Sequence, residues 1–138
     1  MKDIPIGAEG IASVKVTEET LATRAGSGAV DVFSTPNLVL LMEEAAMAAL
    51  QPYMEEGETS VGTLVNIRHL AATPPGFTVT AVARLVQVDG RRLVFQVEAS
   101  DGMDKVGDGT HERFLVFQDR FNLRTQEKST RRTISGVE

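Results

Sequence analysis

The stretch that most constrains the fold is residues 33–54, which carries the one long helical pattern in the sequence. Apolar residues recur there at steps of three and four, the spacing of one face of a helix: Leu38, Leu41, Met42, Ala45 and Ala49. Pro36 suits the first helical turn, and either Ser34 or Thr35 suits the N-cap. Pro52 breaks the pattern near its end. This helix needs an apolar partner, which the rest of the chain has to supply.

The remaining sequence shows β-strand alternation rather than further long helices. We predict strands at residues 11–17, 61–71, 78–88, 92–99 and 106–117. In the strand at 61–71, strict alternation places Val65, Ile67 and His69 on one face and Gly62 on the other. Residues 17–28 are expected to form a loop or short turns, and residues 29–33 a short extended piece. The strands therefore follow the helix as a meander.

Turn sequences separate the last four strands. Residues 73–76 read Thr-Pro-Pro-Gly, and Asp89-Gly90 and Asp101-Gly102 follow. Asp89-Gly90 is typical of a tight two-residue hairpin. Connections this short predict that the four strands form an antiparallel sheet.

One helix cannot cover both faces of such a sheet, but it can fill the concave side of a strongly curved one. We therefore predict an α+β fold of the hot-dog type, a curved antiparallel sheet wrapped around one long central helix. An uncovered sheet edge favours pairing with a second copy, so we expect a homodimer. We place one domain at residues 1–122 of the 138 and expect a polar, poorly ordered tail at 123–138.

Composition excludes several classes of function. No apolar run approaches the roughly 20 residues of a membrane span, and residues 1–10 lack the apolar core of a signal peptide. We therefore expect a cytoplasmic protein without a membrane partner. The net charge of −5 argues against nucleic-acid binding. With two His and no Cys, we expect no metal site, and nothing in the sequence calls for a cofactor.

Four residues are candidates for chemistry. A glutamate, Glu43 or Glu44, interrupts the apolar helix pattern, and periodicity alone does not decide which of them faces a cleft rather than water. His69 lies on the expected inner strand face, where it is either a satisfied core histidine or a general acid–base group. Thr35 is either a simple N-cap or a hydroxyl placed at a helix N-terminus, where a developing oxyanion is stabilised.

A dense polar patch follows at residues 110–113, Thr-His-Glu-Arg. It is either an exposed strand face with cross-strand ion pairs or part of a site for an anionic ligand. In the second case the phosphate-binding side chains would come from four arginines: Arg68, Arg91, Arg92 and Arg113. The Gly-Ser-Gly at 26–28 is not a phosphate loop, because no strand directly precedes it and no helix directly follows it.

The sequence resembles the fluoroacetyl-CoA thioesterases, a family of the hot-dog thioesterases. The resemblance extends over residues 33–113. It rests on Val32-Phe33 and Thr35 before and at the helix start, Leu41-Met42-Glu43 within it, Gly62-Thr63, and His69 with AATPPG at 71–76. GRRL at 90–93 and GTHER at 109–113 complete the set.

The resemblance implies hydrolysis of an acyl-CoA thioester to CoA and a carboxylate. It implies Thr35, Glu43 and His69 as catalytic residues, thereby choosing Glu43 over Glu44, and Gly62 and Arg113 as substrate-binding residues. The aromatic lid segment of the fluoroacetyl enzyme corresponds here to the small residues 25–30, AGSGAV. This departure favours a more open pocket for another short acyl group.

Two alternatives stay open. Hot-dog domains can also bind acyl-CoA or other small ligands without catalysis, and they can hydrate an enoyl-CoA. The presence of Thr, Glu and His together argues against a pure binding module. The enoyl-CoA branch is disfavoured because its typical Asp/His pattern is missing.

Helix geometry adds an expectation about assembly. Thr35 and Glu43 lie eight residues apart, hence about 12 Å apart along one helix axis. They cannot hydrogen-bond to each other within one chain. We therefore expect composite sites in a homodimer, in which the helix N-terminus of one subunit faces Glu43 of the other.

Overall fold

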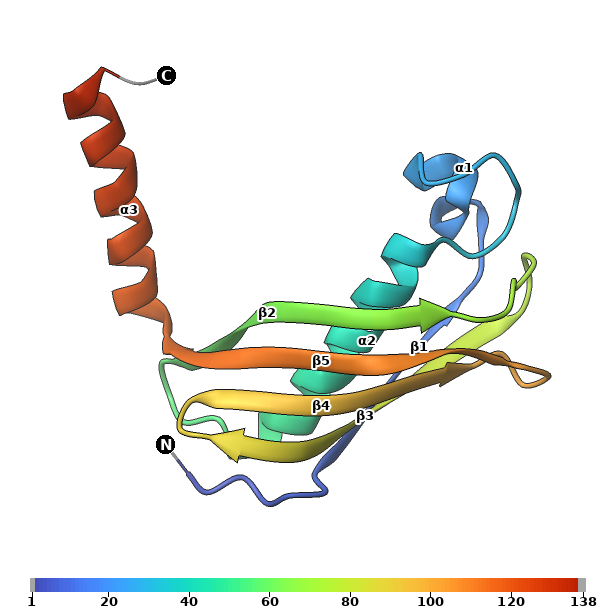
Figure 1. Ribbon diagram of the computed structural model, residues 1–138, viewed down its shortest axis with the longest axis horizontal. Helices are drawn as coiled ribbons and strands as arrows, with labels where there is room; N and C mark the ends of the chain where they lie inside the picture. Colours follow the sequence, from blue (N-terminus) through green and yellow to red (C-terminus); the bar gives the residue numbers. More distant parts are fainter. Residues whose placement is uncertain (1, 137–138) are drawn as a thin grey trace.

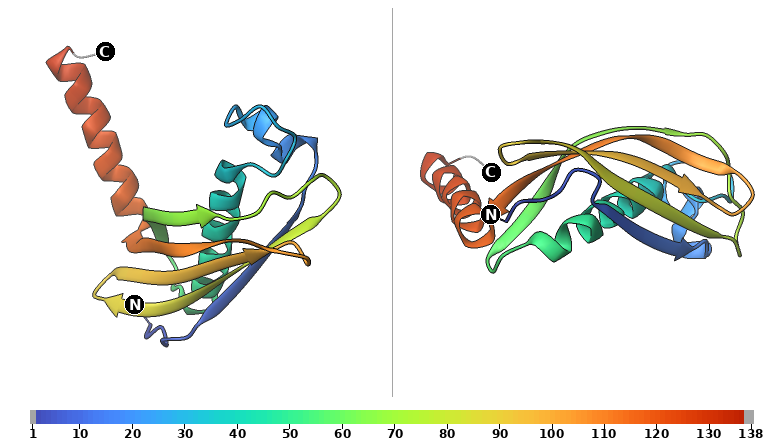
Figure 2. Two further views of the ribbon diagram at one scale, coloured as in Figure 1. Left: turned by 45° about the vertical axis from the view of Figure 1, so that its right-hand side comes forward. Right: turned by 90° about the horizontal axis from the view of Figure 1, so that it is seen from below.

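The computed structural model describes residues 2–136. A curved antiparallel sheet wraps around one long helix, as predicted (Figures 1 and 2). The sheet has five strands in the order β1-β3-β4-β5-β2. In chain order the elements are β1 (Glu9–Lys15), η1 (Glu18–Thr20), α1 (Ala22–Ala25), α2 (Thr35–Leu50), η2 (Gln51–Tyr53), β2 (Glu58–His69), β3 (Thr78–Asp89), β4 (Arg92–Ser100), β5 (Lys105–Phe117) and α3 (Gln118–Ser135).

Helix α2 lies on the concave face of the sheet and provides one side of the core. Ser34 is its N-cap, since its hydroxyl accepts a hydrogen bond from the Asn37 N–H at 3.1 Å. Thr35 is therefore the first helical residue and not the cap. The buried face of the helix matches the predicted periodicity: Leu38, Leu41, Met42, Ala45, Ala46, Ala49 and Leu50.

Small residues let α2 approach the sheet closely. A Cβ atom at Gly10 of β1 would overlap the helix backbone at Ala45 and Ala49. The strands supply larger side chains on the same side, among them Leu85, Leu93 and Phe95, each fully buried. Alanines on the helix and bulky residues on the strands together fill the core.

Strand β2 differs from the prediction in one respect that matters for the site. Its pairing with β5 slips between Gly62 and Leu64, which marks a β-bulge. The extra residue reverses the alternation, so Gly62 points to the same concave side as Val65 and His69. The prediction that Gly62 lies on the opposite face is wrong, because strict alternation does not survive a bulge.

The outer edge of β2 carries an apolar surface. No other strand pairs with this edge within residues 2–136. Four large apolar side chains from β2 and the adjacent face of α2 are 41–51% exposed there: Leu40, Met47, Leu64 and Val65. We call these four residues the edge patch. Leu64 and Val65 lie on opposite faces of β2, so the edge patch has members on both sides of the strand.

Three predicted segments need correction or refinement. Residues 29–32 form bends rather than an extended piece, because only Phe33 pairs, as a single bridge with Leu21. The β3–β4 hairpin is present, but Asp89 pairs with Arg92, so its loop is Gly90-Arg91. The segment predicted as a poorly ordered tail is instead the helix α3, which begins at Gln118 and projects away from the sheet beyond β2 (Figure 1). No described helix is long and apolar enough to cross a membrane.

Candidate active site

Thr35 and His69 meet where the start of α2 faces the end of β2. The Thr35 Oγ1 and His69 Nδ1 atoms are 2.8 Å apart, a hydrogen bond. Thr35 is exposed and His69 is partly buried. We call these two residues the Thr35 pair. The pair unites two residues that are 34 positions apart in the sequence.

The second ring nitrogen of His69 has no partner. Its Nε2 atom is buried and makes no hydrogen bond with any residue in the described part of the chain. Burial lowers the pKa of His69, and the nearby Ala71 carbonyl partly opposes that shift. The lowered pKa favours the neutral imidazole, with one nitrogen bonded to Thr35 and the other buried without a partner in residues 2–136.

A cavity of about 310 Å³ lies beside the Thr35 pair. Residues of α1, of the α1–α2 connection and of the segment after β2 line it together with the pair, and all of them are small or aliphatic except the aromatic Phe33: Ala22, Ser27, Gly28, Val30, Val32, Phe33, Leu70, Ala71 and Ala72. An apolar hollow with few polar groups at one end is typical of a small-molecule site.

The start of α2 offers less to an anion than an ordinary helix N-terminus. Pro36 has no N–H, and the Ser34 hydroxyl accepts the N–H of Asn37. Only the N–H of Thr35 is left without a hydrogen bond among the first three helical residues in the structure. Of the free backbone N–H groups expected at a helix start, only that of Thr35 is left, directly beside the Thr35 hydroxyl.

A hydrogen-bond network that the sequence did not predict holds the loop before Thr35 in place. The Phe33 N–H donates to the Thr73 carbonyl at 2.8 Å, and the Thr73 hydroxyl donates to Asp101 Oδ2 at 2.8 Å. Asp101 also accepts the N–H groups of Met103 and Asp104, and the Asp104 N–H is the main reason that its pKa is lowered. The only sequence cue was a turn at 101–102, which does not show that Asp101 holds the loop before Thr35.

A second polar group lies midway along α2. Arg113 Nη1 contacts Glu43 Oε2 and His111 Nε2, at 3.2 Å in each case. Arg113 also donates through Nε to the Ser60 hydroxyl at 2.8 Å and through Nη2 to the Ser60 carbonyl at 3.0 Å. We call Glu43, Arg113, His111, Ser60 and Gly62 the Glu43 cluster. Arg113 is 4% exposed, so it holds Glu43 from within the protein.

Hydrogen bonding in the cluster fixes the tautomer of His111. Its Nδ1 lies 2.8 Å from the Leu64 carbonyl oxygen, which can only accept, so Nδ1 carries the proton. Nε2 is then free to accept from Arg113. Burial lowers the pKa of His111, with Arg113 adding to the effect and the Leu64 carbonyl opposing it. The cluster contains one neutral imidazole and one ion pair.

Gly62 leaves room for the Glu43 carboxylate. A Cβ atom there would lie 2.8 Å from Glu43 Oε2 and 3.3 Å from His111 Cε1. The Glu43 side chain is 34% exposed and sits beside the edge patch, whereas Glu44 is exposed to solvent. Glu43, and not Glu44, therefore faces the sheet.

The structure thus brings the five candidates together in two groups, Thr35 with His69, and Glu43 with Gly62 and Arg113. No hydrogen bond or ion pair joins the two groups within residues 2–136. The predicted patch at 110–113 splits between faces, since His111 and Arg113 point inward while Glu112 pairs with Arg92 at 2.6 Å. The cross-strand ion pair expected for an exposed face is therefore present at Glu112, and Arg113 is paired with Glu43.

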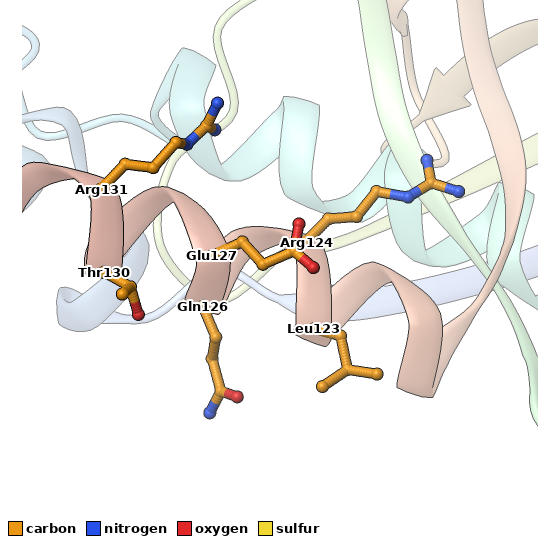
Figure 3. A pocket seen from close by; sticks show the side chains of 6 residues that line it. All are labelled: Leu123, Arg124, Gln126, Glu127, Thr130 and Arg131. Atoms are coloured by element: carbon orange, nitrogen blue, oxygen red, sulfur yellow. The ribbon is translucent and has the colours of Figure 1, made fainter.

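Two other features lie away from these groups. In the described residues, no three His, Cys, Asp or Glu side chains are arranged to hold a metal ion. A hollow of about 650 Å³ runs along α3 (Figure 3). The residues lining it all belong to this one helix: Leu123, Arg124, Gln126, Glu127, Thr130 and Arg131. A hollow without a second wall is a surface feature and not the catalytic site.

A family model described as fluoroacetyl-CoA-specific thioesterase matches residues 16–119, which include both groups. The chain belongs to this family. A fluoroacetyl-CoA thioesterase from Streptantibioticus cattleyicolor is 48% identical over 99 residues, which make up 72% of this chain and 71% of that protein. The family resemblance inferred from the motifs is confirmed, and the chain is a thioester hydrolase by family.

Solved structures confirm the hot-dog fold. A structure of the fluoroacetyl-CoA thioesterase matches with a TM-score of 0.86 at 38% identity, covering 91% of this chain and 98% of that one. A hypothetical Thermus thermophilus protein of the thioesterase superfamily matches at 0.87 and 32% identity, covering 95% and 97%. A hot-dog-like protein from Thermanaerovibrio acidaminovorans matches at 0.82 and 27% identity, covering 91% and 93%.

Proposed function

We propose that this thioesterase hydrolyses a short acyl-CoA to CoA and a carboxylate, as a cytoplasmic homodimer that needs no cofactor. The observation that carries the proposal is the Thr35 pair, a hydroxyl bound to one nitrogen of a neutral imidazole whose other nitrogen is buried and unpartnered. A pure binding site has no need of such an arrangement. It suits a group that exchanges a hydrogen bond with a reacting carbonyl.

In the reaction we infer, the Thr35 hydroxyl donates to His69 Nδ1, which places the ring proton on Nε2. Nε2–H then donates to the thioester carbonyl oxygen, and the Thr35 N–H is a second donor at the same place. Water adds to the carbonyl carbon and gives its proton to a carboxylate. The C–S bond breaks, the sulfur takes that proton to form the CoA thiol, and the carboxylic acid product releases its own proton to water and leaves as its anion.

The carboxylate in this scheme is Glu43 of the partner subunit. Within one chain, Thr35 and Glu43 are about 12 Å apart along α2. Glu43 is one helical turn from Leu40 and Met47 of the edge patch, which a second copy pairing along β2 would cover. Arg113 binds only Oε2 of Glu43, so Oε1 is left to hold water. The exposed apolar edge and the position of Glu43 support the same two-fold arrangement.

The substrate is a short acyl group other than fluoroacetyl. The segment at 25–30 that borders the cavity contains only small and aliphatic residues, and Ser27, Gly28 and Val30 line the hollow. Without an aromatic side chain there, nothing in this segment is suited to a close contact with fluorine. The hollow of about 310 Å³ favours acyl groups of a few carbons.

The test is release of free CoA thiol from a panel of short acyl-CoAs that includes acetyl-CoA and fluoroacetyl-CoA. We expect turnover of at least one ester, no preference for fluoroacetyl-CoA, and a loss of about a hundredfold or more in the folded Glu43→Gln and His69→Ala variants. Glu44→Gln, which changes an exposed neighbour on the same helix, is the matched control and should leave the rate unchanged.

Other outcomes have definite meanings. Saturable binding of acyl-CoA without hydrolysis of any ester would favour the non-catalytic binding module. A strong preference for fluoroacetyl-CoA would overturn the substrate proposal but leave the thioesterase intact. A monomer at working concentration by light scattering, with full activity, would overturn the composite site.

A further inference from the structure

Three arginines meet without an acidic partner where β5 passes into α3. Arg91 and Arg120 each place the guanidinium carbon 5.1 Å from the centroid of the Phe117 ring. Arg124 joins them in lining a small cavity of about 60 Å³ with Phe117 and Phe121. We call Arg91, Arg120, Arg124 and Phe117 the Arg91 cluster. It lies at the end of the sheet where β2 begins, next to the Glu43 cluster along β5 and at the opposite end of β2 from the Thr35 pair.

The cluster is unusual in a chain with a net charge of −5. Three of the other arginines are neutralised, since Arg68 pairs with Asp108 at 3.1 Å, Arg92 with Glu112 and Arg113 with Glu43. The three arginines of the cluster make no ion pair with any residue from 2 to 136. Of the four arginines that the sequence suggested for phosphates, only Arg91 is left available.

The guanidinium groups of the cluster favour an anionic ligand of the size of a phosphate. Converging guanidinium groups repel one another unless an anion lies between them, and their planar donors match the oxygens of a phosphate. The cavity has room for about two water volumes, hence for a single phosphate group rather than a whole ligand. The Phe117 ring is covered by Arg91 and Arg120, whereas the partly exposed Phe121 ring beside the cavity can stack on a nucleobase.

We propose that the Arg91 cluster binds the phosphates of the nucleotide portion of the acyl-CoA substrate. This inference rests on the proposed function and extends it to a subsite remote from the reacting carbonyl. The nucleotide is the strongly anionic part of CoA, and arginines without acidic partners are suited to it. The pantetheine arm then connects this subsite to the Thr35 pair.

The subsite serves the active site of the other subunit. The cluster lies at the start of β2, where the Gln118 N–H donates to the Gly57 carbonyl, and the Thr35 pair lies at its end. The twelve residues of β2 span about 36 Å. Antiparallel pairing of β2 with its copy, centred on Leu64 and Val65 of the edge patch, brings the start of one β2 to the end of the other. Helices α1 and α3 both extend beyond this edge, consistent with such an exchange (Figure 1).

The experiment compares acetyl-CoA with S-acetylpantetheine, which lacks the nucleotide, in the full-length protein. For the Arg91→Gln/Arg120→Gln variant we expect KM for acetyl-CoA to rise about tenfold with kcat unchanged, since charge-assisted hydrogen bonds to phosphate are lost. KM for S-acetylpantetheine should not change. Arg84→Gln, an exposed arginine on β3, is the matched control for charge and should change neither value.

The salt dependence gives a second readout. Raising the ionic strength should raise KM for acetyl-CoA in the native protein and have little effect in the double variant. Equal effects of the double variant on both substrates, or on neither, would overturn the subsite. An increase in KM for acetyl-CoA that 3′-dephospho-acetyl-CoA does not share assigns the contact to the 3′-phosphate, and an equal increase assigns it to the diphosphate.

Failure of the proposed function would give a different pattern of results from failure of the subsite. If no thioester is hydrolysed, titration calorimetry with CoA still tests the cluster, with about tenfold weaker binding expected for the double variant. Unchanged binding of CoA by that variant would overturn the subsite whatever the catalytic result. Binding of inorganic phosphate with the same affinity as CoA would also overturn it, because the cluster would then be a general anion site.

Discussion

The Thr35 pair and the Glu43 cluster differ most in how completely their polar groups are satisfied. Arg113 uses all three of its nitrogen atoms, on Glu43, His111 and Ser60. In the Thr35 pair a single hydrogen bond joins two side chains, and the buried Nε2 atom of His69 has no partner among the described residues. A satisfied network is rigid and costly to disturb, whereas an unsatisfied polar atom gains by binding something else.

The comparison indicates different roles for the two groups: the Glu43 cluster orients a carboxylate, and the Thr35 pair takes part in the reaction. The Glu43 cluster holds one carboxylate oxygen in place and leaves the other open. The Thr35 pair binds one imidazole nitrogen and lies beside a cavity. We therefore expect changes in the pair to lower the rate with little loss of stability, and changes in the cluster to lower stability as well.

The largest effect is expected at Thr35. Replacing Thr35 by Ala removes the partner of His69 Nδ1, and kcat should fall about a hundredfold or more. Stability should change by less than about 1 kcal/mol, because Thr35 is exposed and Ser34 keeps the cap. Steady-state kinetics and chemical denaturation measure the two effects. Thr35→Ser retains the hydroxyl and should retain most of the activity; if it fails as badly as Ala, the hydroxyl is not the functional group.

Arg113→Met tests the opposite side of the comparison. It leaves the buried His111 and the partly exposed Glu43 without their partner, so the free energy of unfolding should fall by about 2 kcal/mol. Arg92→Met removes the exposed pair with Glu112 and should cost less than about 1 kcal/mol. Equal losses in the two variants, measured by urea denaturation, would show that the cluster is no better integrated than a surface pair.

Gly62→Ala sharpens the comparison within the cluster. The added methyl group would lie 2.8 Å from Glu43 Oε2, so the carboxylate has to move. We expect kcat/KM to fall about tenfold with the fold intact, since small displacements of a positioned group are costly. Val61→Ala, whose side chain is on the other face of β2, is the control. An active Gly62→Ala enzyme would mean that the position of Glu43 is not critical.

The sequence predicted the elements better than it predicted how they combine. The helix periodicity, the strands and the turn at 73–76 all follow from local patterns, and the structure confirms them. The face of Gly62 was wrong because a bulge at residues 62–64 has no local cue. Predicting that Asp101 anchors Thr73 would have required knowledge of contacts between distant segments.

The prediction for the C-terminal segment was wrong for a different reason. Residues 118–135 contain no Pro or Gly and many good helix formers, yet periodicity found no helix there because the segment has no apolar face to bury. The structure shows a helix that is exposed along its whole described length. A pattern that depends on burial cannot detect a helix that buries nothing.

The smallest effect, and the one that addresses both groups at once, is the pH dependence. Burial lowers the pKa of both His69 and His111, the only histidines of the chain. Just below the ordinary histidine pKa of about 6.5, the unfolded chain therefore binds protons that the folded chain does not. Stability should be fully present above this pH and decrease as the pH falls toward the folded-state pKa values.

Two-dimensional NMR of the imidazole protons can follow the two histidines separately. We expect both midpoints below 6.5, and we expect the acid limb of kcat/KM to follow His69 and not His111, since only the neutral His69 ring accepts from Thr35 and donates through Nε2. A titration of His69 above 6.5 would mean that its charged form is the stable one. The contrast between a satisfied cluster and a reactive pair would then have to be abandoned, because an imidazolium in the pair requires an anion that the described residues do not supply.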